Sequence, residues 1–204
     1  MMKIVILGAM GTTGQYAVDY ALAAGHEVIA YVRNPGAVKP RPGLTAIGGS
    51  VGDQAAMAEV FASADAVISC LGAQVAVETL LGGTDFLRRM LPRLIGAINA
   101  AGVPRFVLMS SFGIGETAKK AGFIYRYLFM AVIAKRLFDD KAIAEQLLAN
   151  CKANWTAVYP VSLKDGLVDK DWDMLQFASV SKVPGLPVLS FATVAKVLVE
   201  LVKD

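Results

Sequence analysis

Three glycines stand at three-residue spacing near the start of the chain, in the stretch GAMGTTG at positions 8–14. They follow the apolar run Ile4–Leu7 and precede a stretch typical of a helix. Gly8 would let the chain turn sharply out of a strand, Gly11 would let the backbone approach a pyrophosphate, and Gly14 would let the helix pack closely. A helix N-terminus also attracts phosphate. The alternative is a tight turn with incidental glycines, but the flanking strand and helix favour a phosphate cradle.

The residue after the second strand-like run bears on which dinucleotide would bind. The run EVIAYV, at positions 27–32, ends about 20 residues after the glycines and is followed by Arg33. An acidic residue there would accept a hydrogen bond from the ribose 2′-hydroxyl of NAD, whereas an arginine can pair with the 2′-phosphate of NADP. Arg33 therefore favours NADP, with Lys39 and Arg41 as further cations of the following loop. The alternative for Arg33 is a solvated arginine at a strand end.

The elements that would position these residues follow a regular order. Short apolar runs without a clean period of two are typical of strands buried on both faces, and they alternate with longer helical stretches. The expected strands are 3–8, 27–32, 44–48, 65–70, 105–110 and 154–159, and the expected helices are 12–24, 54–63, 84–101, 134–150 and 191–203. This order predicts an α/β fold, a doubly wound Rossmann-type parallel sheet flanked by helices. No linker divides the chain, so we expect one NAD(P)-binding domain over 1–204.

Two segments interrupt the alternation where strands end, which is where open α/β sheets bind ligands. One is the basic, Pro- and Gly-rich loop 33–43, and the other is the aromatic stretch 112–133. The second contains Phe123, Tyr125, Tyr127 and Phe129 between basic ends. For this aromatic segment we favour one of two roles, a lid that covers a planar acceptor or packing in the core. An oligomer interface ranks next, and contact with a membrane surface ranks last.

Composition excludes several classes of function. A net charge of +3 over 204 residues suits an anionic ligand but is too small for nucleic acid as a main partner. Cys70 and Cys151 show no metal or redox spacing, and His26 is the single histidine, so a histidine metal site or a Ser-His-Asp triad has almost no material. We expect His26 in a surface loop, no metal, a cytoplasmic location, and a monomer or homodimer.

The motifs GAMGTTG, YVRNP, DAVISCLG and MSSFG together resemble those of atypical short-chain dehydrogenase/reductases. The greatest similarity is to the small NAD(P)H-binding group that includes flavin reductase/biliverdin-IXβ reductase and NmrA-like proteins. The resemblance extends to about residue 166 and returns in the C-terminal helix.

This resemblance implies specific site residues at the ends of successive strands. Ser50 stands where the family often has an acid that helps to hold the adenine, and Ser110 and Ser111 match the position of the active-site serine. Lys141 matches the lysine that can bond the nicotinamide ribose, although a solvated helix lysine is an equal alternative. The implied cofactor contacts are Gly8, Met10, Gly11, Thr12, Thr13, Gly14, Arg33, Ser50, Val51, Cys70, Leu71, Gly72, Tyr159, Pro160 and Val161.

The catalytic tyrosine of the superfamily is missing. The usual Tyr-x-x-x-Lys motif pairs a phenol that transfers the proton with a lysine that lowers its pKa. Here the lysine is Lys141, but Leu137 stands where the tyrosine belongs. A plain ketone needs a proton donor at the forming alkoxide, whereas a flavin, quinone or similar conjugated acceptor delocalises the charge. We therefore expect an NADPH-dependent reductase of conjugated acceptors; the alternative is an NADP-binding regulator without turnover.

Overall fold

The structure is a computed structural model that describes residues 1–71, 86–112, 115–120, 122, 146–183, 185 and 187–204. Six strands form one sheet in the order β3-β2-β1-β4-β5-β6. In chain order the elements are β1 (Lys3–Leu7), α1 (Thr12–Ala23), β2 (Glu27–Val32), η1 (Pro35–Ala37), β3 (Leu44–Gly48), α2 (Gln54–Phe61), β4 (Ala66–Ser69), α4 (Phe86–Ala101), β5 (Arg105–Met109), η2 (Gly115–Lys120), η4 (Leu147–Asn150), β6 (Asn154–Val158), β7 (Ser162–Lys164), η5 (Phe177–Ser179), β8 (Val188–Ser190), α7 (Phe191–Glu200) and η6 (Leu201–Lys203).

All five pairings in the main sheet are parallel. Strand β1 lies between β2 and β4, so the order of the strands reverses there, and a crevice for ligands opens at such a switch point. This arrangement confirms the predicted doubly wound Rossmann-type fold. The six predicted strands are all present, each within a residue or two of its expected bounds.

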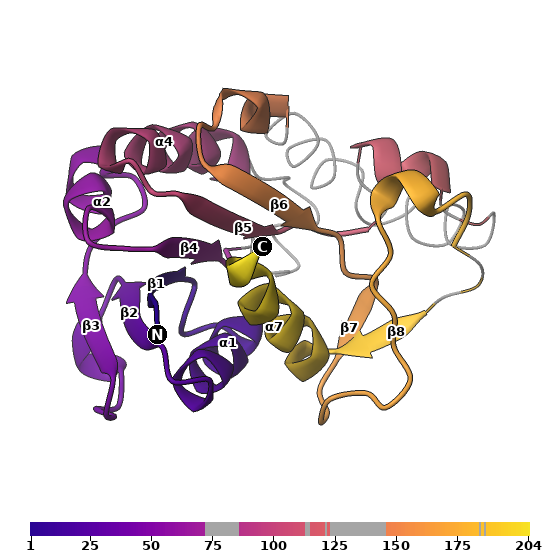
Figure 1. Cartoon of the computed structure of the whole chain (residues 1–204), viewed down its shortest axis with the longest axis horizontal. Coiled ribbons are helices and arrows are strands. Elements are labelled where there is room, and N and C mark those ends of the chain that lie inside the picture. The colour runs from indigo at the N-terminus through magenta and orange to yellow at the C-terminus, as the bar shows by residue number, and fades with distance from the viewer. Residues whose placement is uncertain (72–85, 113–114, 121, 123–145, 184, 186) are drawn as a thin grey trace.

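Helices cover both faces of the sheet, with α2 and α4 on one side and α1 and α7 on the other (Figure 1). Successive strand residues alternate between the two cores. Val5 and Leu7 of β1 pack beneath α2 and α4, whereas Ile4 and Ile6 pack against the helices of the other layer. Because the four inner strands β2, β1, β4 and β5 are apolar on both faces, a three-layer fold hides almost all of their side chains, whereas the edge strands β3 and β6 stay partly exposed.

The predicted helix ends agree with the backbone conformation. Gly25 after α1 and Gly102 after α4 both have positive φ, +78° and +67°, as expected for glycines that end helices. The predicted helix 134–150 lies mostly outside the described residues, and only its last part, η4, is described. The aromatic residues 123–129 also lie outside them.

The predicted surface position of His26 is wrong, because its side chain is only 6% exposed. The Met2 N–H donates a hydrogen bond to His26 Nδ1 at 3.2 Å, which joins the start of β1 to the turn between α1 and β2. Burial, followed by the charges of Lys203 and the N-terminal amine, lowers the pKa of this imidazole. His26 is therefore a neutral structural acceptor and not a solvated loop residue.

A two-stranded parallel sheet of β7 and β8 was not predicted. The chain between these strands makes an excursion that carries η5 and returns through β8 directly into α7 (Figure 1). Asp169 anchors the excursion: its carboxylate accepts hydrogen bonds from the Ser190 N–H at 2.7 Å and from the Thr193 hydroxyl at 2.8 Å. Ser190 and Thr193 are fully buried and Asp169 is half-buried, so the network ties the excursion to the buried start of α7.

Candidate cofactor site

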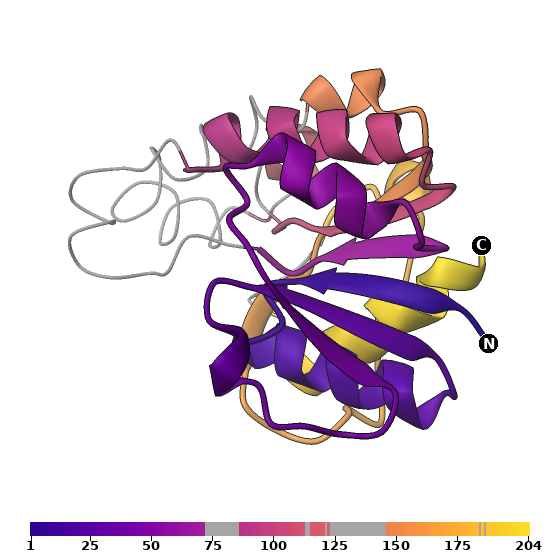
Figure 2. The same cartoon turned by 90° about the vertical axis from the view of Figure 1, so that its left-hand side faces the viewer.

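The candidate site lies at the carboxyl edge of the sheet, the edge toward which the strands run in Figure 2. The chain leaves β1 through Gly8, whose φ of +75° is a conformation that glycine adopts without strain. A Cβ at this position would stand 2.9 Å from the Cys70 carbonyl oxygen, so a side chain would also push into the end of β4. Gly8 therefore allows the turn and the close approach of the two central strands.

Gly11 and Gly14 complete the turn at the start of α1. The Gly11 N–H donates to the Gly8 carbonyl at 2.9 Å, and Gly11 is the N-cap of α1 with no side chain bonded to the helix end. A Cβ on Gly14 would lie 2.0 Å from the Gly8 carbonyl oxygen, a distance that no side chain tolerates. The first N–H groups of α1 consequently point out of a close backbone turn, and this geometry fits a pyrophosphate.

The other side chains of the cradle differ in exposure. Met10 is 45% exposed and Thr12 is exposed, whereas Thr13 is buried. The Gln15 amide donates to the Met10 carbonyl at 2.9 Å, which secures the tip of the turn. The turn can therefore present one hydroxyl, that of Thr12, at the surface beside the helix N-terminus.

The basic residues of the loop after β2 separate to two edges of the sheet. Arg33 is exposed and directly follows β2 at the carboxyl edge, next to the end of β1. Arg41 lies beside the start of β3 at the opposite edge and forms an ion pair with Asp19 of α1. The expectation that Arg41 assists in binding a 2′-phosphate is therefore wrong, because the loop carries it to the other edge of the sheet.

Ser50 and Val51 follow β3 in a turn that Tyr31 supports. The Tyr31 hydroxyl, whose ring is buried, donates to the Ser50 carbonyl at 3.2 Å. A Cβ on Gly49 would lie 2.0 Å from that hydroxyl oxygen, so the glycine makes room for the tyrosine. Burial and the nearby Asp53 carboxylate raise the pKa of Tyr31. No sequence motif predicts this support, and the neighbouring glycines 48 and 49 are its visible sign in the sequence.

The carboxylate of Asp53 has a structural task in the same turn. It accepts a hydrogen bond from the Ala56 N–H at 3.0 Å and so caps α2. The Ser50 hydroxyl is exposed and accepts from the Gly52 N–H at 3.1 Å, which leaves its own proton available for a ligand. The turn after β3, where the sequence predicts a contact with adenine, therefore offers a hydroxyl group.

Cys70 and Leu71 end β4 beside the glycine turn. The Cys70 thiol is buried, and burial raises its pKa to about 12, so it stays protonated at neutral pH. It therefore lines the site as a small apolar group and does not act as a nucleophile or base. Gly72 and Lys141, also candidates from the sequence, lie outside the described residues.

The remaining candidates lie at the carboxyl ends of β5 and β6. The Ser110 N–H donates to the Val158 carbonyl at 2.8 Å, and the Phe112 N–H donates to the Pro160 carbonyl at 2.8 Å. These bonds extend the pairing of the two strands beyond their ends. They bring the buried Ser110 and the half-buried Ser111 beside the segment Tyr159–Val161. The candidate residues that follow all six strands of the main sheet thus share one edge of the sheet.

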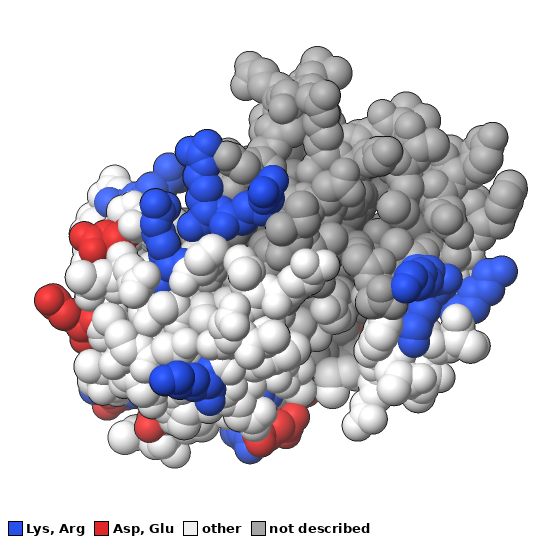
Figure 3. All heavy atoms as spheres, turned by 90° about the horizontal axis from the view of Figure 1, so that it is seen from above, with Lys and Arg blue, Asp and Glu red and all other residues white. Residues whose placement is uncertain are grey.

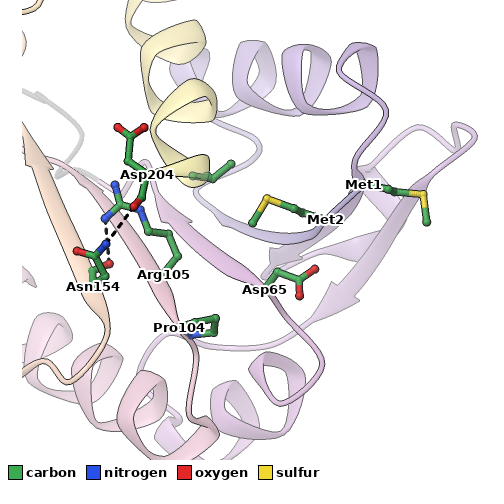
Figure 4. A pocket seen from close by; sticks show the side chains of 8 residues that line it. Met1, Met2, Asp65, Pro104, Arg105, Asn154 and Asp204 are labelled. Atoms are coloured by element: carbon green, nitrogen blue, oxygen red, sulfur yellow. Dashed lines mark hydrogen bonds between the residues drawn. The ribbon is translucent and has the colours of Figure 1, made fainter.

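A hollow of about 410 Å³ opens at the opposite edge (Figure 4). Arg105 lines it, but its buried guanidinium donates to the Leu201 carbonyl at 2.7 and 2.9 Å and to the Asn154 carbonyl at 3.0 Å. Burial lowers the pKa of Arg105. The arginine thus secures the end of the C-terminal helix to β6, and we assign no ligand to this hollow.

The chain matches the sequence profile of a family described as NAD(P)H-binding, over residues 8–204. The chain belongs to this NAD(P)H-binding family. Membership agrees with the resemblance to atypical short-chain dehydrogenase/reductases and with the glycine turn found at the switch point. The family description does not distinguish NAD from NADP.

A curated relative is the photosystem II assembly factor Ycf39 of Synechocystis, 25% identical over 169 residues. The match covers 82% of this chain and 47% of Ycf39, so the chain spans about half the length of that relative.

Solved structures with the same fold include ChuY, an anaerobilin reductase from Escherichia coli, with a TM-score of 0.74 and 21% identity over 98% of this chain and 89% of that one. A short-chain dehydrogenase/reductase from Veillonella parvula in complex with NADP has a TM-score of 0.78 and 16% identity over 100% and 88% of the two chains. WbmH of Bordetella bronchiseptica in complex with NAD⁺ has a TM-score of 0.72 and 15% identity over 100% and 72%. At these identities, the similarity concerns the fold.

The described residues also show neither the pattern of a metal site nor that of a membrane-spanning helix. Within them, no group of three histidine, cysteine, aspartate or glutamate side chains is placed to hold a metal ion. Among the helices of that same part of the chain, none is long and apolar enough to cross a membrane.

Proposed function

We propose that the protein is an NADPH-dependent reductase that passes hydride to a flavin, quinone or similar conjugated acceptor. The observation that carries the choice of cofactor is the exposed Arg33 at the carboxyl end of β2, beside the glycine turn of β1. A guanidinium at this position can pair with a 2′-phosphate, which NADPH has and NADH lacks. When bound, NADPH supplies the hydride, which carries both electrons of the reduction.

Each part of the cofactor has a group to hold it in this proposal. The free N–H groups at the start of α1 bind the pyrophosphate, with the Thr12 hydroxyl beside them. Ser50 and Val51 contact the adenine, and Cys70 and Leu71 pack beneath the dinucleotide where it crosses the switch point. Ser110, Ser111 and the segment Tyr159–Val161 orient the nicotinamide end, together with Gly72 and Lys141 from outside the described residues.

The acceptor class follows from the groups available for proton transfer. Leu137 replaces the phenol of the superfamily, and the Cys70 thiol, with a pKa of about 12, is a poor acid at neutral pH. Reduction of a simple ketone requires a proton at the developing alkoxide, whereas a conjugated acceptor can spread the charge and take a proton from water afterwards. The chain is therefore better suited to conjugated acceptors than to ketones.

The experiment that tests this proposal is a screen of NADPH oxidation against flavins, quinones and simple ketones. We expect turnover with conjugated acceptors and little with ketones. Rapid turnover of ketones would show that another residue supplies the proton and would refute the assignment of acceptor class.

A second candidate is an NADP-binding regulatory protein without turnover, and Leu137 is the observation that favours it. Its similarity to a relative named as an assembly factor is compatible with that role. Tight NADPH binding without oxidation by any acceptor in the screen would establish the regulator and exclude the reductase.

A further inference from the structure

Three segments that are distant in the sequence meet at the carboxyl ends of β5 and β6. Phe112 is buried there and packs against Tyr159, Val161 and Val183. The Val183 N–H donates to the Lys120 carbonyl at 2.8 Å, which joins η2 to the excursion between β7 and β8. This small apolar cluster is separate from the two main cores of the protein.

Lys120 and Phe177 form a contact across this junction. The Lys120 ammonium stands 3.7 Å from the centroid of the Phe177 ring and also donates a hydrogen bond to the Phe177 carbonyl. The Phe177 ring is tilted by 42° to that of Tyr159, with 6.5 Å between the two centroids. The carbonyl and the ring together hold the ammonium in one position, while its remaining N–H donors can serve another acceptor.

Phe177 remains 43% exposed although it takes part in this contact. The ammonium covers one face of the ring, so a flat apolar molecule can pack only on the part of the ring that stays exposed, while the ammonium itself can face an anion. The half of a doubly wound sheet that contains β4, β5 and β6 holds one of the two nucleotides of a bound dinucleotide. Tyr159 and Phe112 lie at the ends of these strands, so the contact stands on the side of the site where an acceptor must approach.

We propose that Lys120 and Phe177 determine acceptor specificity, with Phe177 packing on the planar part of the acceptor and Lys120 pairing with an anionic substituent, a carboxylate or a phosphate. This inference rests on the proposed reductase function, because only a reductase would use the ligand as a hydride acceptor. It goes further in requiring a negative charge on the acceptor.

FMN and riboflavin are matched probes, because they share the ring system and differ in a phosphate. Binding of each is measured by flavin fluorescence on the protein saturated with NADP⁺, for the wild type, Lys120→Gln and Phe177→Leu. Lys120→Gln keeps a donor for the Phe177 carbonyl but removes the charge. Lys152→Gln is the control, since Lys152 is an exposed lysine just before β6, at the opposite edge of the sheet.

We expect the wild type and Lys152→Gln to bind FMN about tenfold more tightly than riboflavin, as a charge-assisted hydrogen bond would give. Lys120→Gln should bind the two flavins equally, and Phe177→Leu should weaken both while keeping their ratio. A purely structural contact between η2 and η5 would change both affinities together in Lys120→Gln.

The outcomes separate this inference from the proposed function. An unchanged preference for FMN in Lys120→Gln, or failure of both flavins to bind, would overturn the inference even if quinones are reduced. A preference that depends on Lys120, in a protein that oxidises no NADPH, would sustain the inference as a ligand site and refute the reductase.

Discussion

Arg33 and Arg41 belong to one basic loop, yet only Arg33 lies at the edge of the sheet where the glycine turn is found. This separation supplies a matched pair of variants. Arg33→Ala should weaken NADPH binding by about tenfold to a hundredfold, the range expected for loss of a hydrogen-bonded charge pair, and should leave NADH binding almost unchanged. Calorimetric titration of both cofactors measures the difference.

Arg41→Ala removes the same charge from the opposite edge and should leave the NADPH/NADH ratio as it is. Equal loss of both cofactors in Arg33→Ala would refute the assignment of the 2′-phosphate contact.

Gly14 is the residue at which the backbone tolerates the least change. Because an added Cβ would lie 2.0 Å from the Gly8 carbonyl oxygen, Gly14→Ala must move α1 away from the end of β1. We expect a loss of about 3 kcal/mol in the free energy of unfolding, the upper end of typical overpacking costs, together with loss of NADPH binding. Denaturant unfolding and a binding titration measure the two effects.

Gly25→Asn, at the other end of α1, is the control for this variant. An added Cβ there meets nothing within 4 Å, and asparagine tolerates a positive φ better than most residues. Wild-type stability in Gly14→Ala would show that α1 does not pack closely enough on the Gly8 carbonyl for an added Cβ to clash.

His26 should make the stability of the protein depend on pH. Its pKa is lowered in the folded state, so the unfolded chain takes up the proton first. The stabilisation is complete above the ordinary imidazole pKa of 6.5 and is lost as the pH falls through the lowered value of the folded state. Denaturant unfolding between about pH 5 and pH 8 should show this loss.

His26→Gln can still accept a hydrogen bond from Met2 and cannot be protonated in this range. We expect it to flatten the acid side of the profile. The same acid slope in this variant would assign the effect to other groups.

At the scale of elements, the strands of the main sheet were predictable because each is a short run, mostly of apolar or β-branched residues, in a chain where such runs alternate with longer helical stretches. The pair β7 and β8 was not predictable: each strand has three residues, and they pair across the long excursion that separates them. The contact between Lys120 and Phe177 was missed for the same reason, since nothing local in either segment points to the other. The buried position of His26 depends on the backbone of Met2, which sequence pattern does not indicate.

The network of Asp169 tests how firmly the excursion is held. The Ser190 N–H and the Thr193 hydroxyl bond the charged form of this carboxylate and lower its pKa. The stabilisation is therefore present above the ordinary aspartate pKa and is lost as the pH falls through the lowered folded value. Asp169→Asn should raise hydrogen exchange in the excursion and in β8 at neutral pH by several-fold, with smaller changes in β1 and β4.

Asp171→Asn removes a neighbouring exposed carboxylate and serves as the control. Uniform loss of protection across the whole chain in Asp169→Asn would show that the excursion does not open independently.

At the scale of the whole molecule, basic side chains gather on the face above α4 (Figure 3), where Arg88, Arg89 and Arg93 are exposed. With a net charge of +3, this surface should attract an anionic dinucleotide at long range. The association rate of NADPH should fall by about threefold between about 0.01 M and about 0.15 M salt, because screening shortens the range of the attraction. Stopped-flow fluorescence measures this rate.

The triple variant Arg88→Gln, Arg89→Gln and Arg93→Gln should reduce this salt dependence and leave the dissociation rate unchanged. A faster dissociation rate would instead place these arginines in contact with the cofactor.

Helix α7 packs against α1, and its first turn holds the carboxylate of Asp169. One covalent path therefore runs from Tyr159, through the excursion and β8, to a helix that packs against α1, the helix after the glycine turn. The free energies of binding at the two ends of the crevice need not be independent. If a ligand bound near Tyr159 stiffens α7, it should raise the affinity for a ligand bound at the start of α1. By reciprocity, the second ligand should raise the affinity for the first by the same factor, so the protein would bind its two ligands cooperatively without a hinge motion.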